Sequence, residues 1–437
     1  MNEFQCRRAR FFEQMDGNSM AVFSAASEQM RNNDAEYRFR QSSDFYYLSG
    51  LKEPDACLLL IKTAGSQKAL LFNRPKDKNA EIWYGYRMGQ SAAVRELGVD
   101  DAYPIETLQY HLQALLNGLT TLYFPIFQDS GLDKILKSVV NELRADKRKG
   151  KVAPSIFIDS LPILHEMRLI KSPVEVSLLS AAAEISAAGH IRAMQKCHSG
   201  MWEYQLQAEV EHEFALQGTR EIAYNSIVAG GENACILHYT ENNRQLYDGD
   251  LVLIDAGAEY QGYAGDITRT FPVNGVFSEY QAKLYQLVLN AQISAISQIK
   301  PGVSMFDINK NIIKQLVDGL LELGILQGES EVLIENEAYK DFYMHGIGHY
   351  LGLDVHDVGD YGTPENPRLL ESGMVVTIEP GLYISNDAEV DEVWKKIGIR
   401  IEDDVVVTES GAEVLTADVP KSINEIEALM ANGKQYS

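Results

Sequence analysis

Two aspartates that flank a short turn constrain this chain more than any other feature of its sequence. Asp255 ends the apolar run 251–254, and Asp266 follows it after ten intervening residues. The stretch between them predicts a turn around Gln261-Gly262 that joins two antiparallel strands. Both aspartates lie about equally far from this presumed turn. The simplest register therefore places them directly opposite each other, with Cβ atoms roughly 4.5–5.5 Å apart.

Two facing carboxylates in a buried strand need a counter-charge. Like charges directly opposite each other destabilise a sheet, and the apolar run before Asp255 predicts burial. A cation is the first candidate, because two divalent ions about 3.5–4 Å apart fit between such carboxylates. The alternatives are a pair of exposed turn acids, or one acid that forms an ion pair with Arg269.

A segment rich in histidine and glycine follows later in the chain. HGIGHYLGLDVHDVG places His345, His349 and His356, three of the nine histidines, close together. Glycines between them allow the backbone to approach a ligand or another strand closely. A lone histidine is more often a core residue than a ligand. The clustering favours a functional site without telling which histidine binds.

Two further acids lie on predicted strands. Glu379 ends the apolar run VVTIE, just before a Pro-Gly turn, and Glu402 lies in IGIRIEDDVVVT. Strand alternation places Arg400 on the same face as Glu402, where an arginine can hold a ligand carboxylate in place. The alternatives are a solvated strand-end glutamate and a surface ion pair. Together the motifs supply one histidine and four carboxylates, an oxygen-rich set that suits Mn(II) and similar ions.

The pattern of elements predicts two domains. Apolar runs near 21 and from 56, 68 and 121 alternate with helix-like stretches such as 106–119, which is typical of an α/β layer structure. Charged segments then follow, and Ser172 and Pro173 predict the N-cap and first turn of a helix. We expect an N-terminal α/β domain at 1–168 and a C-terminal domain at 169–437.

The second domain is predicted to place helices outside antiparallel strands. Two long helical segments at 174–194 and 202–218 precede the hairpin, a helical pair spans about 278–325, and further strands begin at 375 and 397. The expected fold class is therefore α+β.

Composition excludes several partners. A net charge of −23 repels nucleic acid and anionic membrane surfaces. The four cysteines show no CxxC pairing, which disfavours a disulfide framework or a sulfur-ligated zinc site. The start of the sequence lacks the apolar stretch of a secretory signal, and no run approaches the roughly 20 apolar residues of a membrane span. We expect a cytoplasmic protein.

The motifs resemble a known family. The Asp-(10)-Asp pair, HGIGH with a later histidine, IEPGLY and IRIEDD are similar to the metallopeptidases with the pita-bread fold, which include methionine aminopeptidase, prolidase, creatinase and aminopeptidase P. The likeness spans 170 to about 415, and the stretch 238–273 looks most like the aminopeptidase P group. FRQSSDFYYLSGL and IWYGYRMGQ in the N-terminal part fit the same group.

The resemblance implies a role for each candidate residue. It makes Asp255, Asp266, His349, Glu379 and Glu402 ligands of two divalent metal ions, expected to be Mn(II), with Asp266 and Glu402 bridging them. His238 and His356 match the non-ligand histidines of the active site, and Glu379 and Arg400 complete the catalytic set. Candidates for substrate contact are Asp44, Trp83, His345 and Tyr383. The smaller domain in this group helps to close the substrate pocket, often across a subunit interface.

The implied activity is hydrolysis of the bond between an N-terminal residue and a following proline by a hydroxide held between two metals. The partners are then peptides with proline in second position, and the protein is expected to be a homo-oligomer, a dimer or a tetramer. Prolidase, which cuts Xaa-Pro dipeptides, is the nearest alternative. A non-enzymatic pita-bread binding protein is the alternative from another class, and the complete ligand set argues against it and against the metal-free creatinase.

Overall fold

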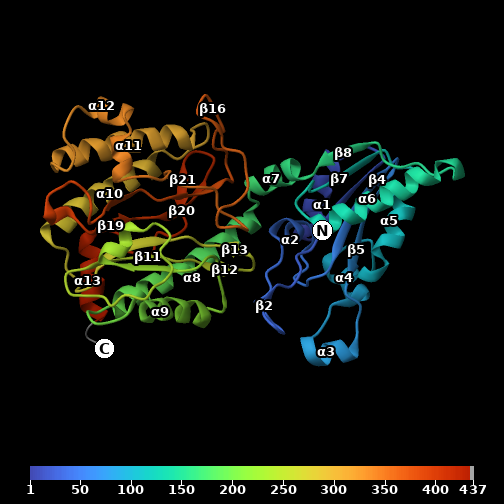
Figure 1. The fold of residues 1–437 in the computed structure, drawn as a ribbon, viewed down its shortest axis with the longest axis horizontal. Coiled ribbons are helices and arrows are strands. Elements are labelled where there is room, and N and C mark those ends of the chain that lie inside the picture. Colours follow the sequence, from blue (N-terminus) through green and yellow to red (C-terminus); the bar gives the residue numbers. More distant parts are fainter. Residues whose placement is uncertain (434–437) are drawn as a thin grey trace. The chain divides into compact units, whose positions relative to one another are not determined.

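The structure is a computed structural model that describes residues 1–433. The chain forms two compact units, unit 1 at Met1–Met167 and unit 2 at Arg168–Ser437, the latter described as far as Gly433. Figure 1 shows unit 1 in blue to green and unit 2 in green to red. Each unit has its own hydrophobic core.

Unit 1 is built on a six-stranded mixed sheet in the order β6-β5-β4-β1-β7-β8. β4 is antiparallel to both β1 and β5, whereas the other neighbouring pairs, β5-β6, β1-β7 and β7-β8, are parallel. The strands are β1 (Ser19–Ser24), β4 (Cys57–Thr63), β5 (Ser66–Asn73), β6 (Asp101–Pro104), β7 (Thr121–Phe124) and β8 (Ile156–Asp159). The four strands expected from the apolar runs are all present.

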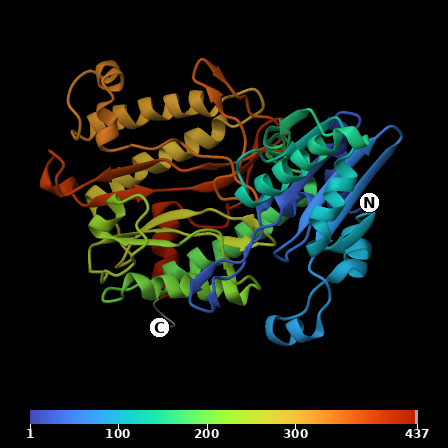
Figure 2. The same ribbon diagram turned by 45° about the vertical axis from the view of Figure 1, so that its right-hand side comes forward.

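Helices cover both faces of this sheet. Alternate strand residues such as Val22 and Leu59 pack with α5 and α6 on one face, and Phe23 contacts Phe11 of α1 on the other, at 5.3 Å between ring centroids. The helices that lie within unit 1 are α1 (Glu3–Gln14), α2 (Ser43–Ser49), α3 (Lys78–Tyr84), α4 (Gly89–Leu97), α5 (Leu108–Leu116) and α6 (Ser130–Ala145), and α7 (Leu161–Leu169) runs past Met167 into unit 2. A short hairpin joins β2 (Met30–Asn32) and β3 (Ala35–Glu36). α3 extends away from the sheet (Figure 2).

Unit 2 begins with the helix that the sequence predicts. α8 (Pro173–Lys196) follows the N-cap Ser172, whose side chain accepts a hydrogen bond from the Glu175 backbone while Glu175 accepts one from the Ser172 backbone. This capping box satisfies two of the backbone donors at the start of the helix. α8 packs against α9 (Glu203–Leu216).

The hairpin at the centre of unit 2 has the predicted turn but a different register. Gln261 and Gly262 have φ values of 51° and 94°, as a two-residue hairpin turn of type I′ requires. The turn centre lies between them, one residue further along the chain than the midpoint of Asp255 and Asp266. Asp255 is therefore paired with Thr268, and the prediction that it lies directly opposite Asp266 is wrong.

The remaining strands form small antiparallel sheets between the helices. They are β9 (Glu221–Ile222), β10 (Ile227–Gly230), β11 (Leu251–Asp255), β12 (Ala258–Tyr260), β13 (Tyr263–Ala264), β14 (Thr268–Pro272), β15 (Gly362–Thr363), β16 (Asn366–Pro367), β17 (Val375–Ile378), β18 (Gly381–Ile384), β19 (Ile397–Arg400), β20 (Asp403–Val407) and β21 (Ala412–Val414). β11 lies between β10 and β14, and β20 lies between β17 and β21.

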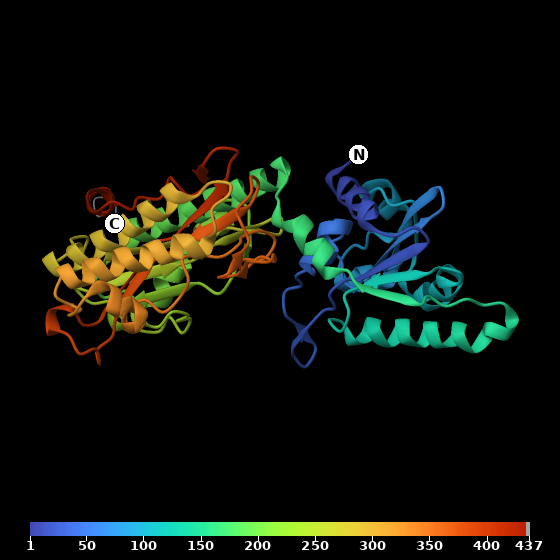
Figure 3. The ribbon, with the colours of Figure 1, turned by 90° about the horizontal axis from the view of Figure 1, so that it is seen from above.

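Helices lie outside these strands, as predicted. α10 (Glu279–Gln298) and α11 (Met305–Glu322) run side by side (Figure 3), and α12 (Ser330–Glu335) and α13 (Ile423–Gly433) complete the described part of the unit. The predicted strand at 397–408 is split in two: β19 pairs with β18, whereas β20 pairs with β17. Across residues 1–433, none of the helices combines the length and apolar character needed to cross a membrane.

Candidate metal centre

A cavity of about 480 Å³ in unit 2 collects most of the predicted site residues. Its volume lies within the range of about 300–1,000 Å³ that is usual for small-molecule sites. The predicted residues that line it are His238, Asp255, Asp266, His345, His349, His356, Glu379, Arg400 and Glu402. These residues are spread over positions 238–402 of the sequence, and they come together because strands of unit 2 end around the cavity.

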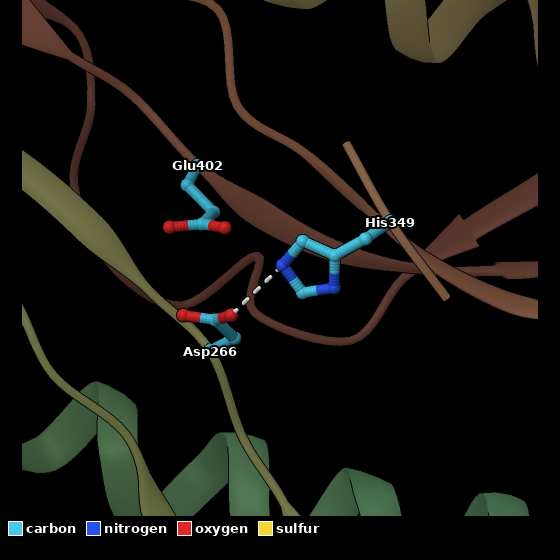
Figure 4. A group of neighbouring side chains, drawn as sticks. All are labelled: Asp266, His349 and Glu402. Carbon is cyan, nitrogen blue, oxygen red and sulfur yellow. Dashed lines mark ion pairs between the residues drawn. The ribbon is translucent and has the colours of Figure 1, made fainter. Parts of the chain in front are cut away.

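The four acids are placed by strand ends. Asp255 is the last residue of β11, and Asp266 lies just before β14, the strand paired with β11. Glu379 directly follows β17, and Glu402 lies between β19 and β20. Figure 4 shows the side chains of Asp266 and Glu402 converging with His349.

Glycine allows His349 to reach the acids. A Cβ atom at Gly348 would overlap with the carbonyl oxygen of Thr377, so only glycine permits this approach of the two backbones. His349 and Thr377 are then joined by two hydrogen bonds, from the His349 backbone to Thr377 Oγ1 at 3.1 Å and from the Thr377 backbone to the His349 carbonyl at 2.8 Å. The predicted close approach also occurs at Gly352, next to Asp357, but Gly346 has open space around it.

The tautomer of His349 follows from its contacts. Nδ1 lies 3.0 Å from the Tyr350 carbonyl oxygen, which can only accept, so Nδ1 carries a proton. Nε2 points to the acids, 3.4 Å from Asp266 Oδ2 and 3.6 Å from Glu379 Oε1. In metal sites the nitrogen opposite such a backbone contact is the one that binds the ion.

The pKa values show that burial disfavours the charged form of three of the acids. Burial, followed by the charges of the neighbouring acids, raises the pKa of Glu402 well above its usual value. Burial also raises the pKa of Asp266, and it raises that of Glu379 to about 7. For His349, burial lowers the pKa but the contact with Asp266 outweighs it, and the result is about 9.

Tyr224 lies within the site although no sequence feature pointed to it. Its hydroxyl oxygen is 2.6 Å from Asp255 Oδ1 and 2.5 Å from Asp266 Oδ1. A phenol has one proton and can donate to only one of these carboxylates at a time. Burial and then the charge of Asp255 raise the pKa of Tyr224 well above its usual value, so the proton is retained at neutral pH.

The set of donors fits divalent ions. Ligand atoms of Asp266, His349 and Glu402 lie within 4.8 Å of one another. Arg400 Nη2 donates to Asp255 Oδ2 at 2.5 Å, so this acid is paired with Arg400 rather than with Arg269. The charges of His349 and Arg400 act on the remaining acids but do not outweigh their burial, and a cation among them would offset their excess negative charge. Four carboxylates and one imidazole suit ions such as Mn(II) and Zn(II).

A hydrogen-bonded chain connects Arg400 to His345. Arg400 Nη1 donates to the Tyr383 hydroxyl oxygen at 3.0 Å, and this hydroxyl lies 2.8 Å from His345 Nε2. His345 Nδ1 faces the Gly346 carbonyl at 2.8 Å and carries a proton, so in the neutral ring Nε2 accepts from Tyr383. Burial, followed by the charge of Arg400, lowers the pKa of His345 to about 4, which keeps the ring neutral.

The two predicted non-ligand histidines lie at the open side of the cavity. His238 and His356 line it and are exposed. The His356 ring lies edge-on to the His349 ring, at 4.3 Å between centroids. Burial, followed by the charge of His349, lowers the pKa of His356.

The other two predicted site residues belong to unit 1. Asp44 lies in the first turn of α2, with Oδ2 at 3.3 Å from His165 Nε2. Trp83 lies on α3 with 81% of its surface exposed. Their contribution to substrate binding stays a prediction.

Both units match known protein families. Residues 177–409 match the model of metallopeptidase family M24, and residues 4–123 match the aminopeptidase P N-terminal domain. The first match covers more than half of the chain. This chain belongs to metallopeptidase family M24. The predicted family and the predicted two-domain α+β architecture are therefore confirmed.

Relatives of this M24 metallopeptidase match it from end to end. The Xaa-Pro aminopeptidase of Escherichia coli K12 is 50% identical over 434 residues, which cover 99% of this chain and 98% of that protein. The Xaa-Pro aminopeptidase of Haemophilus influenzae is 51% identical over 429 residues, which cover 98% and 97%.

Solved structures agree with the sequence comparison. Zinc-substituted aminopeptidase P of E. coli in complex with product has a TM-score of 0.97 at 50% identity, over 99% of this chain and 98% of that chain. Proline aminopeptidase P II of Yersinia pestis has the same TM-score and identity, over 99% and 100%.

Metal binding by this site is expected to tighten as the pH rises. Glu379, with a pKa of about 7, and His349, with one of about 9, must each lose a proton to bind an ion. Because both values are raised, the protonated forms persist to higher pH and compete with the metal. From about pH 6 to about pH 8 we expect the Mn(II) affinity to rise by at least about tenfold per unit. Calorimetric titration at several pH values measures it, and an affinity that stays constant over this interval would contradict the prediction.

Proposed function

We propose that this M24 metallopeptidase is a Xaa-Pro aminopeptidase, which removes the first residue of a peptide whose second residue is proline. The observation that carries the proposal is the likeness to Xaa-Pro aminopeptidases over 97–98% of their length. It extends through the N-terminal domain as well as the catalytic one. The five candidate ligands support it, because all of them line one cavity.

The chain's own residues supply the proton transfer. Divalent ions in such a site lower the pKa of water and polarise a carbonyl group. Glu379 accepts a proton in the cavity and returns it to the leaving amine. Its carboxylate lines the cavity beside the other candidate ligands, within reach of a proton released there.

His238 and His356 stabilise the charge that develops on the carbonyl oxygen of the substrate. Both line the cavity, and their exposure leaves ring N–H groups available to a bound peptide. Arg400 holds Asp255 through Nη2 and Tyr383 through Nη1, so it fixes the wall of the cavity behind these groups.

A proline in second position must be recognised by shape, because the Xaa-Pro bond has no N–H group. Ile227, Leu237 and Val355 contribute apolar surface to the lining of the cavity. His345 and Tyr224 also line the cavity. We assign the proline ring to this apolar part of the wall.

Peptide length separates the proposal from its nearest alternative. We expect release of the first residue from Xaa-Pro-Yaa tripeptides and much slower cleavage of Xaa-Pro dipeptides. Chromatography of the products, with an Xaa-Ala-Yaa peptide as control, measures both. Preferred cleavage of the dipeptide would instead assign the protein as a prolidase, and no cleavage of any of these peptides by the metal-loaded protein would favour a binding protein.

We propose two Mn(II) ions per subunit as the cofactor. Four carboxylates with one imidazole form an oxygen-rich set, which suits this ion. Metal analysis of the purified protein, followed by reactivation of the stripped protein with single metals, tests the assignment. A single ion per chain would contradict it.

We also propose that the protein is a homo-oligomer. α3 and the residues after it expose a continuous run of large apolar side chains, 82–84 and Tyr86, each more than three-quarters exposed. Exposed apolar clusters of this kind mark interaction surfaces. Light scattering is expected to give the mass of a dimer or a tetramer, and Trp83→Ala is expected to shift it towards the monomer. A monomeric wild-type protein would contradict the proposal.

The cytoplasmic location stays a prediction.

A further inference from the structure

Glu402 occupies an irregular junction of the chain. β19 ends at Arg400 and β20 begins at Asp403, and the two strands pair with different partners. No ladder of strand pairing therefore holds Glu402 in place. Two contacts with Thr268 do so in part: its hydroxyl lies 2.6 Å from Glu402 Oε2, and its carbonyl accepts from the Glu402 backbone at 3.1 Å.

Arg269 binds the same junction with every donor that it has. A guanidinium group has five N–H donors. Nη1 bonds to the carbonyl oxygens of Glu402 at 2.6 Å and Thr268 at 3.0 Å. Nη2 bonds to Asp403 Oδ1 at 2.7 Å and to the Val419 carbonyl at 3.2 Å. Nε bonds to the Pro420 carbonyl at 3.2 Å. The side chain is fully buried, so these five contacts replace water completely.

Asp403, the residue after Glu402, is satisfied to the same degree. A carboxylate offers about four acceptor positions. Oδ1 accepts from Arg269 Nη2 and from Thr416 Oγ1 at 2.8 Å, and Oδ2 accepts from Gln292 Nε2 at 2.7 Å and Lys421 Nζ at 2.5 Å. Asp403 is fully buried as well. Its position is therefore fixed by four side chains.

The segment 416–421, which is distant from Arg269 in the sequence, supplies further hydrogen-bond partners for Arg269 and Asp403. It supplies Thr416, two of the four carbonyls that Arg269 binds, and Lys421. Tyr285 of α10 donates to the Lys421 carbonyl at 2.8 Å, which anchors the segment to the helix. Fixed in this way, the segment holds Asp403, and Asp403 holds the backbone next to Glu402.

We propose that Arg269 and Lys421 are positioning residues for the metal centre: together with Asp403 they fix Glu402, and so set the affinity for the metal. The proposal rests on the metal site proposed above. Neither residue touches the cavity, so each acts through Glu402. Removal of a residue that orients a metal ligand without binding the metal itself usually lowers the metal affinity by about 10–100-fold.

A second ion triad in unit 2 provides a matched control. Arg168 and Lys171 pair with the buried Asp357, with Lys171 Nζ at 3.0 Å from Oδ2. Asp403 follows the candidate ligand Glu402, whereas Asp357 follows His356, which is not a candidate ligand. Lys171→Met therefore removes the same kind of ion pair beside a different active-site residue.

The experiment compares Lys421→Met and Arg269→Lys with Lys171→Met in the full chain. Mn(II) is titrated into each metal-stripped protein by calorimetry, and thermal unfolding is followed by circular dichroism without metal. We expect Lys421→Met and Arg269→Lys to raise the Kd for Mn(II) about 10–100-fold. We expect Lys171→Met to lower the Tm but to leave this Kd unchanged. Lys421 lies at the edge of the cluster with 25% of its side chain exposed, so its variant tests the proposal even if Arg269→Lys does not fold.

Two outcomes would overturn this inference alone. One is a folded Lys421→Met that binds Mn(II) as tightly as the wild-type protein. The other is a Lys171→Met that loses as much affinity as Lys421→Met, because the effect would then follow from general loosening of the fold. A wild-type protein that binds no Mn(II) would overturn the proposed metal site itself, and this inference with it.

Discussion

Replacing Glu402 with glutamine is expected to abolish both metal retention and peptide hydrolysis. Glutamine has nearly the shape of glutamate but cannot supply the negative charge, and its carbonyl is a weaker ligand for a divalent ion. Glu402 is buried, and burial raises its pKa, so its charged form is unfavourable at this position. A bound cation would stabilise that charged form. Elemental analysis of the purified variant and the Xaa-Pro-Yaa assay measure the two losses.

Glu409→Gln is the control for this substitution. Glu409 is an exposed glutamate just beyond β20, the strand that follows Glu402, so the same chemical change is made without touching the cavity. We expect it to keep the metal content and the activity of the wild-type protein. A Glu402→Gln protein that retains its full metal content would show that Glu402 is not a ligand.

Local features of the fold followed from the sequence because each depends on a few neighbouring residues. Ser172 with Glu175 forms the capping box that opens α8, and Gln261 with Gly262 forms the predicted turn. The register of the hairpin was wrong for an equally local reason. A shift of the turn centre by one residue moves the partner of each strand residue by two, so Asp255 faces Thr268.

Contacts between distant segments could not be predicted in the same way. Tyr224 lies 31 residues before Asp255, and Arg269 lies 150 residues before Val419, with nothing in the intervening sequence to indicate that they meet. Asp403 also looked like one more acid in the run IRIEDD. Its burial among two cations follows only from the way in which β19, β20 and the segment 416–421 converge.

The contrast between candidate ligands and supporting groups explains why the candidate ligands were easier to single out from the sequence than the residues around them. Each candidate ligand is an acid or a histidine at the end of an apolar strand or among glycines, where it is conspicuous. Supporting residues such as Thr268 and Thr377 are ordinary strand residues. Their hydrogen bonds to Glu402 and His349 depend on register, which the sequence pattern did not determine.

His356→Ala is expected to retain the metal and to lose most of the catalytic rate. The His356 ring contacts the ring of His349, but His349 is held independently by the Tyr350 carbonyl and by Thr377. Removal of His356 therefore leaves the candidate ligand in place. The loss of a hydrogen-bond donor to the developing oxyanion lowers kcat by about 100–1,000-fold.

Parallel measurements of metal content and of kcat and KM separate this role from that of a ligand. A donor that acts mainly in the transition state lowers kcat and kcat/KM together, with little change in KM. His198→Ala, which removes an exposed histidine on the loop after α8, is the matched control and is expected to change neither quantity. If His356→Ala lost its metal to the same extent as Glu402→Gln, the ring would have to be a ligand or to hold one in place. If it kept both metal and rate, the oxyanion would have to be stabilised by His238 instead.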